Sequence, residues 1–199
     1  MIPLAWQQEV MASPARFKVV AGGRRVGKDT FIALEGFRQA MVLGKRVGVI
    51  CPNDHMATFT WRQFRDYEAT QYDFFPSTPG YFEVGLEANR RAILDGEPNY
   101  IMVNEAAMCD QEVWSNLLAP YSETHPNCRF VFLGTPLGLN WFWSLYGVGL
   151  DPAHTEWQSW RFPTTVNLYL SPQSVEQSKQ DMPELYEQEI LAEFTEVPK

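Results

Sequence analysis

One glycine-rich segment constrains the fold more than any other part of the sequence: Gly22-Gly23-Arg24-Arg25-Val26-Gly27-Lys28-Asp29-Thr30. It follows an apolar run, 17–21, that is typical of a buried strand, and it precedes a run, 31–41, whose periodicity predicts a helix. In that context the pattern G-x-x-x-x-G-K predicts a loop whose backbone N–H groups, lysine and helix N-terminus bind phosphate. The alternative is an accidental turn rich in glycine and arginine.

The position after Lys28 departs from the usual form of this loop. Ser or Thr normally stands there as a magnesium ligand, whereas this chain has Asp29, with Thr30 one place later. Further along, the apolar run 100–103 ends in Asn104 and Glu105. These two side chains therefore lie at the carboxyl end of a predicted strand, where ligands bind in open α/β sheets.

Asp29 and Asn104 together suggest an exchanged metal site. The usual site pairs a hydroxyl on the loop with a carboxylate on the strand, and here the carboxylate is on the loop and the neutral amide on the strand. The amide can donate a hydrogen bond to the carboxylate, as a hydroxyl would. The hypothesis is that Asp29 binds Mg²⁺ directly or through water and that Asn104 orients it. The alternatives are that Thr30 substitutes, that Asn104 is an engineered change, or that the site binds ATP weakly and turns it over poorly.

Four other side chains are candidates for the nucleotide site. Glu105 is predicted to activate the attacking water, unless it is an ordinary surface glutamate. Thr135 follows the apolar run 129–133 and could sense loss of the γ-phosphate, unless it belongs to a plain turn. Trp6 and Gln7 could stack on an adenine and hydrogen-bond its edge, or they could simply begin a helix.

The remaining pattern alternates strands and helices with short links, which predicts an α/β fold with parallel pairing. The predicted strands are 17–21, 46–52, 81–84, 90–94, 100–103, 129–133 and 157–162. Beyond 31–41, the predicted helices are 54–67, 110–121, 141–146, one that starts at 171–172, and 183–194, and a loop is predicted at 76–80.

Length and charge exclude several classes of protein. The 199 residues suffice for one domain, alone or with a small appendage, and no apolar run approaches the roughly 18 residues that cross a membrane. No secretion signal is visible, so we expect a cytosolic protein with Cys51, Cys109 and Cys128 reduced. The formal charge of −8 argues against a broad nucleic-acid-binding face, but it does not exclude a local basic surface that contacts nucleic acid.

Taken together, these segments resemble the ATPase domain of a tailed-phage terminase large subunit, the motor that packages viral DNA through a portal. The resemblance runs in order over nearly the whole chain. It rests on Trp6-Gln7, the arginine-rich loop 23–28, the strand end 49–52, Asn104-Glu105-Ala106-Ala107, Gly134-Thr135-Pro136 and the segment 186–194.

The resemblance implies a fold and roles for single residues. The fold is an α/β P-loop NTPase of the ASCE/RecA-like class, with a mainly parallel sheet flanked by helices and a small C-terminal lid. Residues 1–150 would form the ATPase core and residues 151–199 the lid. Lys28 would bind the β- and γ-phosphates, Arg24 would contact the γ-phosphate within its own subunit, Glu105 would be the catalytic carboxylate and Thr135 would couple hydrolysis to motion.

It also implies cofactors and partners. These are ATP and Mg²⁺, double-stranded DNA, a portal protein, a small terminase subunit and a separate nuclease domain or protein. The usual C-terminal nuclease domain is not found in the sequence, so no DNA cleavage is expected. The chain would form a homo-oligomeric ring, a pentamer, on the portal in the host cytoplasm, with a monomer as the alternative in isolation.

Three functions stay open from the sequence. The first is an ATP-driven DNA translocase, and the second is a nucleotide-binding assembly protein with little turnover. The third is a helicase-like ATPase outside packaging. Because the chain is acidic, we expect the isolated chain to bind DNA weakly and in a salt-sensitive way at most.

Overall fold

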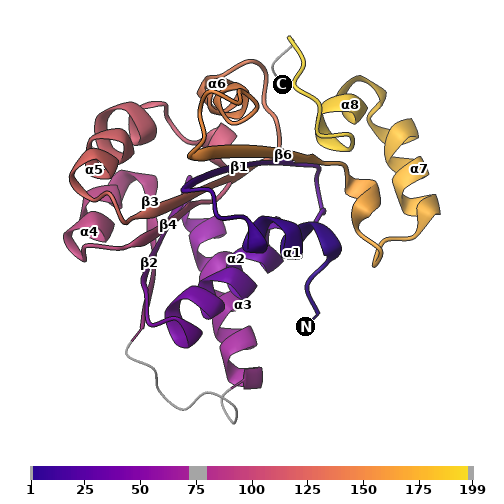
Figure 1. Cartoon of the computed structure of the whole chain (residues 1–199). Coiled ribbons are helices and arrows are strands. Elements are labelled where there is room, and N and C mark those ends of the chain that lie inside the picture. The colour runs from indigo at the N-terminus through magenta and orange to yellow at the C-terminus, as the bar shows by residue number, and fades with distance from the viewer. Residues whose placement is uncertain (1, 72–79, 197–199) are drawn as a thin grey trace. The chain divides into compact units, whose positions relative to one another are not determined.

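The computed structural model describes residues 2–71 and 80–196, and these form a six-stranded parallel sheet with the strand order β3-β2-β4-β5-β1-β6 (Figure 1). The strands are β1 (Phe17–Gly22), β2 (Arg46–Cys51), β3 (Tyr81–Leu86), β4 (Tyr100–Val103), β5 (Arg129–Gly134) and β6 (Trp157–Phe162). The predicted α/β class with a mainly parallel sheet is confirmed.

Helices connect the strands. They are α1 (Ala5–Ala12), α2 (Lys28–Phe37), α3 (Asp54–Gln71), α4 (Arg90–Asp95), α5 (Ala119–Thr124), α6 (Trp141–Val148), α7 (Pro172–Asp181) and α8 (Tyr186–Glu189). Shorter turns are π-helical at Arg38–Val42 and Val113–Leu118, and 3₁₀ at Glu87–Asn89, Ala106–Met108, Thr164–Val166 and Pro183–Leu185. The helix predicted from position 110 thus begins at position 113. The loop predicted at 76–80 lies outside the described residues, apart from Gly80.

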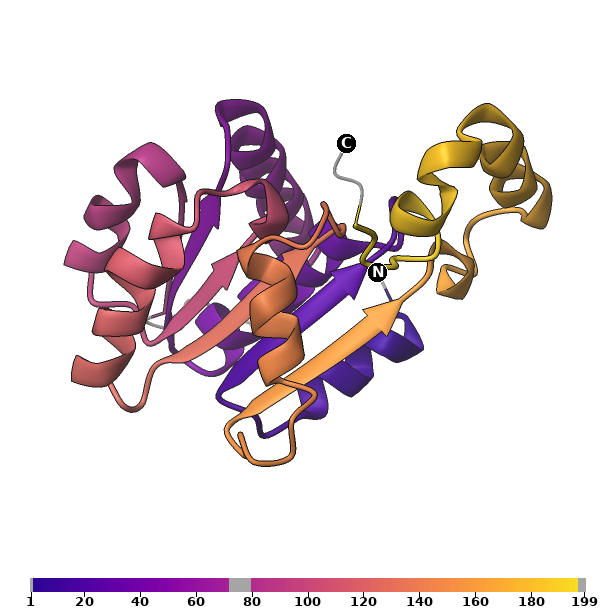
Figure 2. The same cartoon turned by 90° about the horizontal axis from the view of Figure 1, so that it is seen from above.

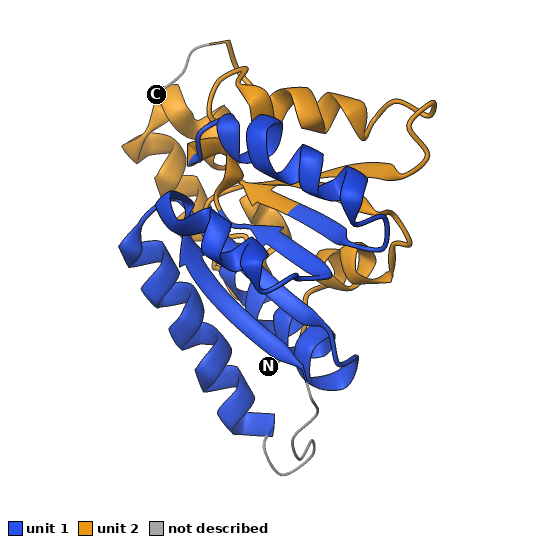
Figure 3. Cartoon of the chain, turned by 90° about the vertical axis from the view of Figure 1, so that its left-hand side faces the viewer, with its two compact units in different colours: residues 1, 29–104, 109–131 blue, residues 2–28, 105–108, 132–199 orange. Residues whose placement is uncertain are grey.

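The chain forms two compact units, shown in blue and orange in Figure 3. Unit 1 contains residues 29–104 and 109–131, and unit 2 contains residues 2–28, 105–108 and 132–199. The predicted boundary between 150 and 151 falls inside unit 2, so the division into an ATPase core and a lid stays a prediction.

In unit 1, β2 pairs in parallel with β3 on one side and with β4 on the other. Successive side chains of a strand point to opposite faces, so Phe82 and Gly85 of β3 face opposite ways. Phe82 stacks on Phe64 of α3, with 3.7 Å between ring centroids, whereas Gly85 lies against Ile93 of α4. Helices α3 and α4 therefore cover opposite faces of this part of the sheet.

The prediction of a strand at 90–94 is wrong, because these residues lie in α4. Arg91 is exposed whereas Ile93 is buried, and the Ile93 side chain packs where β2 and β3 carry glycine. A Cβ added at Gly48 or Gly85 would lie 2.5 or 2.7 Å from that side chain. A helix as short as α4 needs only one large buried side chain to pack on the sheet, and the glycines of β2 and β3 leave room for it. The apolar run in the sequence did not reveal this.

In unit 2, β1 pairs in parallel with β6 over six positions, from Phe17 opposite Trp157 to Gly22 opposite Phe162. Every residue of β1 is buried. Helix α6 covers one face of this strand pair and α1 the other, and α7 and α8 lie beyond the carboxyl end of β6 (Figures 1 and 2). The carboxyl ends of two neighbouring strands thus lead into the glycine-rich loop and into the segment that follows β6.

The prediction of one helix over 183–194 is wrong in its extent, because α8 ends at Glu189. The Glu189 carbonyl accepts a hydrogen bond from Arg24 N at 2.6 Å, and the Ile190 carbonyl accepts one from Thr164 N at 2.7 Å. Those carbonyls are therefore not available to continue the helix. The chain instead turns back through Ala192, whose φ is 56°.

The chain contains three cysteines. Cys51, Cys109 and Cys128 are all buried and free of disulfides. Among the described residues, no helix combines the length and the apolar character that a membrane crossing requires.

A fully buried carboxylate, that of Glu35, organises polar groups inside unit 1. Arg38 donates to both of its oxygens, at 2.7 and 2.8 Å, and Gln39 and the Tyr100 hydroxyl each donate to Oε1 at 2.8 Å. Burial, followed by the nearby carboxylate, raises the pKa of Tyr100 well above its ordinary value. Tyr100 therefore stays protonated and serves as a hydrogen-bond donor.

Removing this hydroxyl should destabilise the protein more than removing a similar one. Tyr100→Phe takes a donor from a charged acceptor, whereas Tyr121→Phe takes one from the neutral carbonyl of Pro98. We expect Tyr100→Phe to lower the free energy of unfolding by about 1.5–3 kcal/mol and Tyr121→Phe by about 0.5–1.5 kcal/mol. Urea unfolding of both variants measures the difference, and an equal or reversed order would contradict the role given to Glu35.

Candidate nucleotide-binding site

The glycine-rich loop at residues 22–28, hereafter the P-loop, contains two residues in the left-handed region of backbone conformation. Arg25 and Gly27 have positive φ values of 62° and 103°. A Cβ at Gly23 would lie 2.6 Å from the Ile190 carbonyl oxygen, closer than real Cβ atoms come. The glycine at that position therefore allows the close approach of two backbone segments.

Helix α1 holds the P-loop from one side. The Trp6 indole donates to the Val26 carbonyl at 3.2 Å, and Gln7 Nε2 donates to the Gly27 carbonyl at 2.9 Å. Gln7 Oε1 accepts a hydrogen bond from Leu4 N at 2.8 Å. Trp6 is 3% exposed and Gln7 is 0% exposed. The structure thus places this pair on the P-loop backbone, and the predicted contact with adenine stays a prediction.

The segments after β6 and α8 hold the same loop from another side. Besides the hydrogen bond from Arg24 N to the Glu189 carbonyl, Thr164 Oγ1 donates to the Arg24 carbonyl at 2.7 Å and Asn167 Nδ2 to the Arg25 carbonyl at 2.7 Å. Neither Thr164 nor Asn167 was expected from the sequence. Their position after a strand that pairs with β1 is the signal that could have found them, because the carboxyl ends of neighbouring parallel strands carry ligand-site residues.

Lys28 lies at the centre of a buried polar cluster in unit 2. Its ammonium donates to Thr135 Oγ1 at 2.8 Å and to the Gly22 and Gly23 carbonyls at 3.1 and 3.3 Å. It also pairs with Glu105 Oε1 at 3.3 Å, with side-chain exposures of 5% for the lysine and 17% for the glutamate. The structure therefore brings together three of the side chains singled out from the sequence.

Glu105 is held in a fixed position within this cluster. Its other carboxylate oxygen accepts a hydrogen bond from Thr135 N at 3.1 Å. Its backbone has a φ of 47°, which costs a non-glycine residue roughly 1–2 kcal/mol. Such strain tends to occur at functional sites, where the surrounding structure maintains it.

Asp29 and Asn104 meet in unit 1. Asn104 Nδ2 donates to Asp29 Oδ1 and to Thr60 Oγ1, each at 3.1 Å. Asn104 is 0% exposed, and its Oδ1 atom has no hydrogen-bond partner. Thr60, on α3, was not expected from the sequence, because no motif marks it.

This cluster fits a magnesium ion better than a transition metal. Among the described residues, no three side chains of His, Cys, Asp and Glu gather into a metal-binding group. Mg²⁺, however, binds proteins through one or two carboxylates and keeps several waters. A carboxylate beside a buried amide oxygen that lacks a partner supplies the hard oxygen atoms that this ion prefers.

Comparison with known proteins finds similarity to terminase large subunits. No family model matches the chain. The terminase large subunit of Escherichia phage T5 is 25% identical over 194 residues, which cover 90% of this chain and 44% of that protein. The chain therefore spans less than half the length of this curated relative.

Solved structures are similar over almost the whole chain. The large terminase ATPase domain of Thermus phage P74-26 superposes with a TM-score of 0.79 at 20% identity, covering 98% of this chain and 94% of that one. The large terminase of another thermophilic bacteriophage, in complex with ATP-gamma-S, gives 0.75 at 17% identity, covering 97% and 53%. The predicted resemblance to terminase large subunits is confirmed, and the chain shares the fold of these terminase ATPase domains.

Because the Ile190 backbone lies so close to Gly23, a methyl group added at Gly23 should destabilise the protein. We expect Gly23→Ala to lower the free energy of unfolding by about 1–3 kcal/mol, because the backbone of Ile190 cannot move aside easily. Gly147→Ala, in helix α6 with open space around its Cβ, is the control and should raise the free energy by up to about 1 kcal/mol. Thermal unfolding measures both, and a neutral Gly23→Ala would contradict the packing described for the P-loop.

Proposed function

We propose that the chain is an ATPase motor subunit of a viral DNA-packaging complex, which hydrolyses ATP to move double-stranded DNA into a procapsid. The observation that carries the proposal is the buried cluster of Lys28, Glu105 and Thr135 at the P-loop. It includes a cation that would bind phosphate, a carboxylate that would bind water, and a hydroxyl directly after β5. The similarity to phage terminase large subunits supports the packaging role.

The ion pair between Lys28 and Glu105 suggests how substrate binding prepares the reaction. A triphosphate in the P-loop would compete with the carboxylate for the lysine ammonium, because phosphate carries more charge and more acceptor oxygens. Glu105 would then be free to accept a hydrogen bond from water and orient it toward the γ-phosphate. Thr135, which contacts both partners, would respond to the presence of that phosphate.

Other residues would hold the phosphates. The N–H groups in the first turn of α2, which begins at Lys28, would supply donors and the positive end of the helix dipole. Arg24 is exposed at the tip of the loop and would contact the γ-phosphate in its own subunit. Trp6 and Gln7 would contribute by fixing the loop backbone.

Magnesium would be held by Asp29, directly or through water, with Asn104 orienting the carboxylate. The ion would neutralise charge on the phosphates when bound. The orphaned Asn104 Oδ1 atom supports this assignment, since a water or an ion would satisfy it.

The remaining partners follow from the likeness to packaging motors. They would be a portal protein, a small terminase subunit and a nuclease domain or protein, with the chain acting in a homo-oligomeric ring at the procapsid in the host cytoplasm. Contact with DNA would depend on a local basic surface, because the net charge is −8.

Glu105→Gln tests the catalytic assignment with the least change in shape. We expect steady-state ATP hydrolysis, measured with Mg²⁺ in the presence of DNA and portal, to fall about 100-fold or more, while nucleotide binding persists. Glu112→Gln, at an exposed glutamate, is the control and should leave the rate unchanged. If the wild-type chain binds ATP without turnover under all these conditions, it is a nucleotide-binding assembly protein instead. Strand separation without dependence on the portal would indicate a helicase-like ATPase.

Asp29→Ala and Thr30→Ala separate the two possible magnesium ligands. If Asp29 holds the ion, Asp29→Ala should abolish the gain in ATP affinity that Mg²⁺ provides, whereas Thr30→Ala should keep it. Titration of each variant with ATP, with Mg²⁺ and with EDTA, measures that gain. Loss of the magnesium effect in Thr30→Ala alone would rule out the exchanged site.

A further inference from the structure

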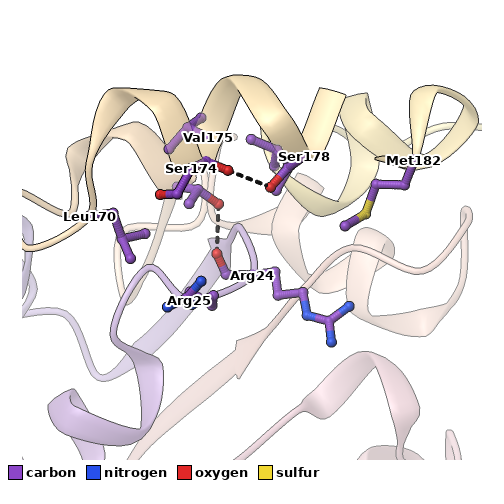
Figure 4. A pocket seen from close by; sticks show the side chains of 9 residues that line it. Arg24, Arg25, Leu170, Ser174, Val175, Ser178 and Met182 are labelled. Atoms are coloured by element: carbon purple, nitrogen blue, oxygen red, sulfur yellow. Dashed lines mark hydrogen bonds between the residues drawn. The ribbon is translucent and has the colours of Figure 1, made fainter. Parts of the chain in front are cut away.

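Thr164 holds a backbone atom of the P-loop with its side chain. It lies in the 3₁₀ turn Thr164–Val166 that follows β6, and it is 2% exposed. Its Oγ1 donates to the Arg24 carbonyl at 2.7 Å, and its N donates to the Ile190 carbonyl at 2.7 Å. Thr164 and Arg24 both line the pocket in Figure 4, where helix α7 forms the opposite wall. The proposed function gives this threonine no role.

Arg24 is held at both of its backbone groups. Its N donates to the Glu189 carbonyl at 2.6 Å, and its carbonyl accepts the hydrogen bond from Thr164. The preceding residue is fixed as well, because Gly23 N donates to the Phe162 carbonyl at 2.9 Å. The backbone at Arg24 is therefore anchored to segments that are remote in the sequence.

An anchored backbone matters for Arg24 because of the contact proposed for its side chain. Arg24 is exposed at the tip of the loop, and its side chain is long. A guanidinium binds phosphate best through two parallel N–H···O hydrogen bonds, which require a fixed orientation as well as a short distance. The position of the Cα atom decides which of these orientations the side chain can reach. A misplacement of about 1 Å can lower the rate of a reaction about 100-fold.

The surroundings of Thr164 Oγ1 are too crowded for an apolar group to replace the hydroxyl. A Cβ at Gly23 would lie 2.6 Å from Oγ1, and Oγ1 itself lies 2.7 Å from the Arg24 carbonyl oxygen. Non-bonded carbon atoms pack at about 3.5–4.0 Å from one another. A methyl group in place of the hydroxyl would therefore push the Arg24 carbonyl away and would also remove its donor.

We propose that Thr164 is a positioning residue for Arg24: its hydroxyl fixes the backbone from which the guanidinium reaches the γ-phosphate. Thr164 then contributes to the distinction between ATP and ADP without touching the nucleotide. The inference rests on the proposed function, since it assumes a triphosphate on the P-loop with its γ-phosphate at Arg24.

The test compares the affinities for ADP and for the non-hydrolysable analogue AMP-PNP, each with Mg²⁺, because only the analogue has a phosphate at the γ position. In Thr164→Val, AMP-PNP should bind about tenfold more weakly, because the charge-assisted hydrogen bonds from Arg24 are weakened. The affinity for ADP should stay within about twofold of the wild-type value, because ADP lacks the group that Arg24 contacts.

Two variants serve as controls. Thr165→Val makes the same change at the neighbouring, exposed threonine of the same turn and should leave both affinities unchanged. Thr164→Ser keeps the hydroxyl, so it should bind AMP-PNP as the wild type does. If far-UV circular dichroism shows that Thr164→Val does not fold, Thr164→Ala is measured in its place. That variant removes the hydroxyl without placing a methyl group beside the Arg24 carbonyl.

A double variant shows whether the effect passes through Arg24. Arg24→Ala alone should weaken binding of AMP-PNP and spare that of ADP. Adding Thr164→Val to Arg24→Ala should then change the AMP-PNP affinity by less than about twofold, because the guanidinium that Thr164 positions is already absent. A further loss as large as that in the wild-type background would overturn the inference, since Thr164 would then act independently of Arg24.

The results separate this inference from the proposed function. If the wild type binds neither ADP nor AMP-PNP, both fail. If Arg24→Ala weakens AMP-PNP selectively and Thr164→Val leaves the ratio of the two affinities unchanged, only the role of Thr164 is overturned. An equal loss of both affinities in a folded Thr164 variant has the same meaning, since a contact that only supports the fold would affect both nucleotides alike.

Discussion

The structure depends on how the backbone of the P-loop is held. This loop contains two residues with positive φ, Arg25 and Gly27, and a glycine that is crowded by another backbone segment. Hydrogen bonds from α1 reach the carbonyls at its end, and hydrogen bonds from the segments after β6 and α8 reach its tip. Because this part of the loop is not helical, its carbonyls lack the partners that a helix would give them, so neighbouring segments have to satisfy them. The first and last parts of the described chain supply those partners.

The P-loop could be predicted from the sequence because its chemistry is local. Gly22 to Thr30 follow one strand and begin one helix, and both periodicities are visible in a window of about a dozen residues. The strands 100–103 and 129–133 are short apolar runs of the same kind, and their ends supply Glu105 and Thr135. That these two side chains contact Lys28 follows from the rule that parallel strands end at one edge.

What the sequence could not predict depends on contacts between distant segments. The run at 90–94 has the composition of a strand, and only the glycines on β2 and β3 show why Ile93 sits on a helix above them. The last helix ends early because its carbonyls bond to Arg24 and Thr164, more than 20 residues away in the chain. Thr60 joins Asn104 from the middle of a long helix and has no local signal at all. In each case the deciding partner is remote in sequence.

The two polar clusters suggest a reason for the exchange of Asp29 and Asn104. Lys28 already faces Glu105 in unit 2, and Asp29, the next residue, has its own partner in Asn104, the residue before Glu105. Lys28 and Asp29 are thus neighbours in sequence, and so are their partners. The lysine pairs with the carboxylate of Glu105, and the aspartate accepts a hydrogen bond from the amide of Asn104. A second carboxylate in place of Asn104 would face Asp29 at hydrogen-bonding distance, and two like charges that close would not both stay ionised without a cation. The amide removes that repulsion and donates a hydrogen bond to the carboxylate instead, so Asn104 accommodates Asp29 without a second negative charge.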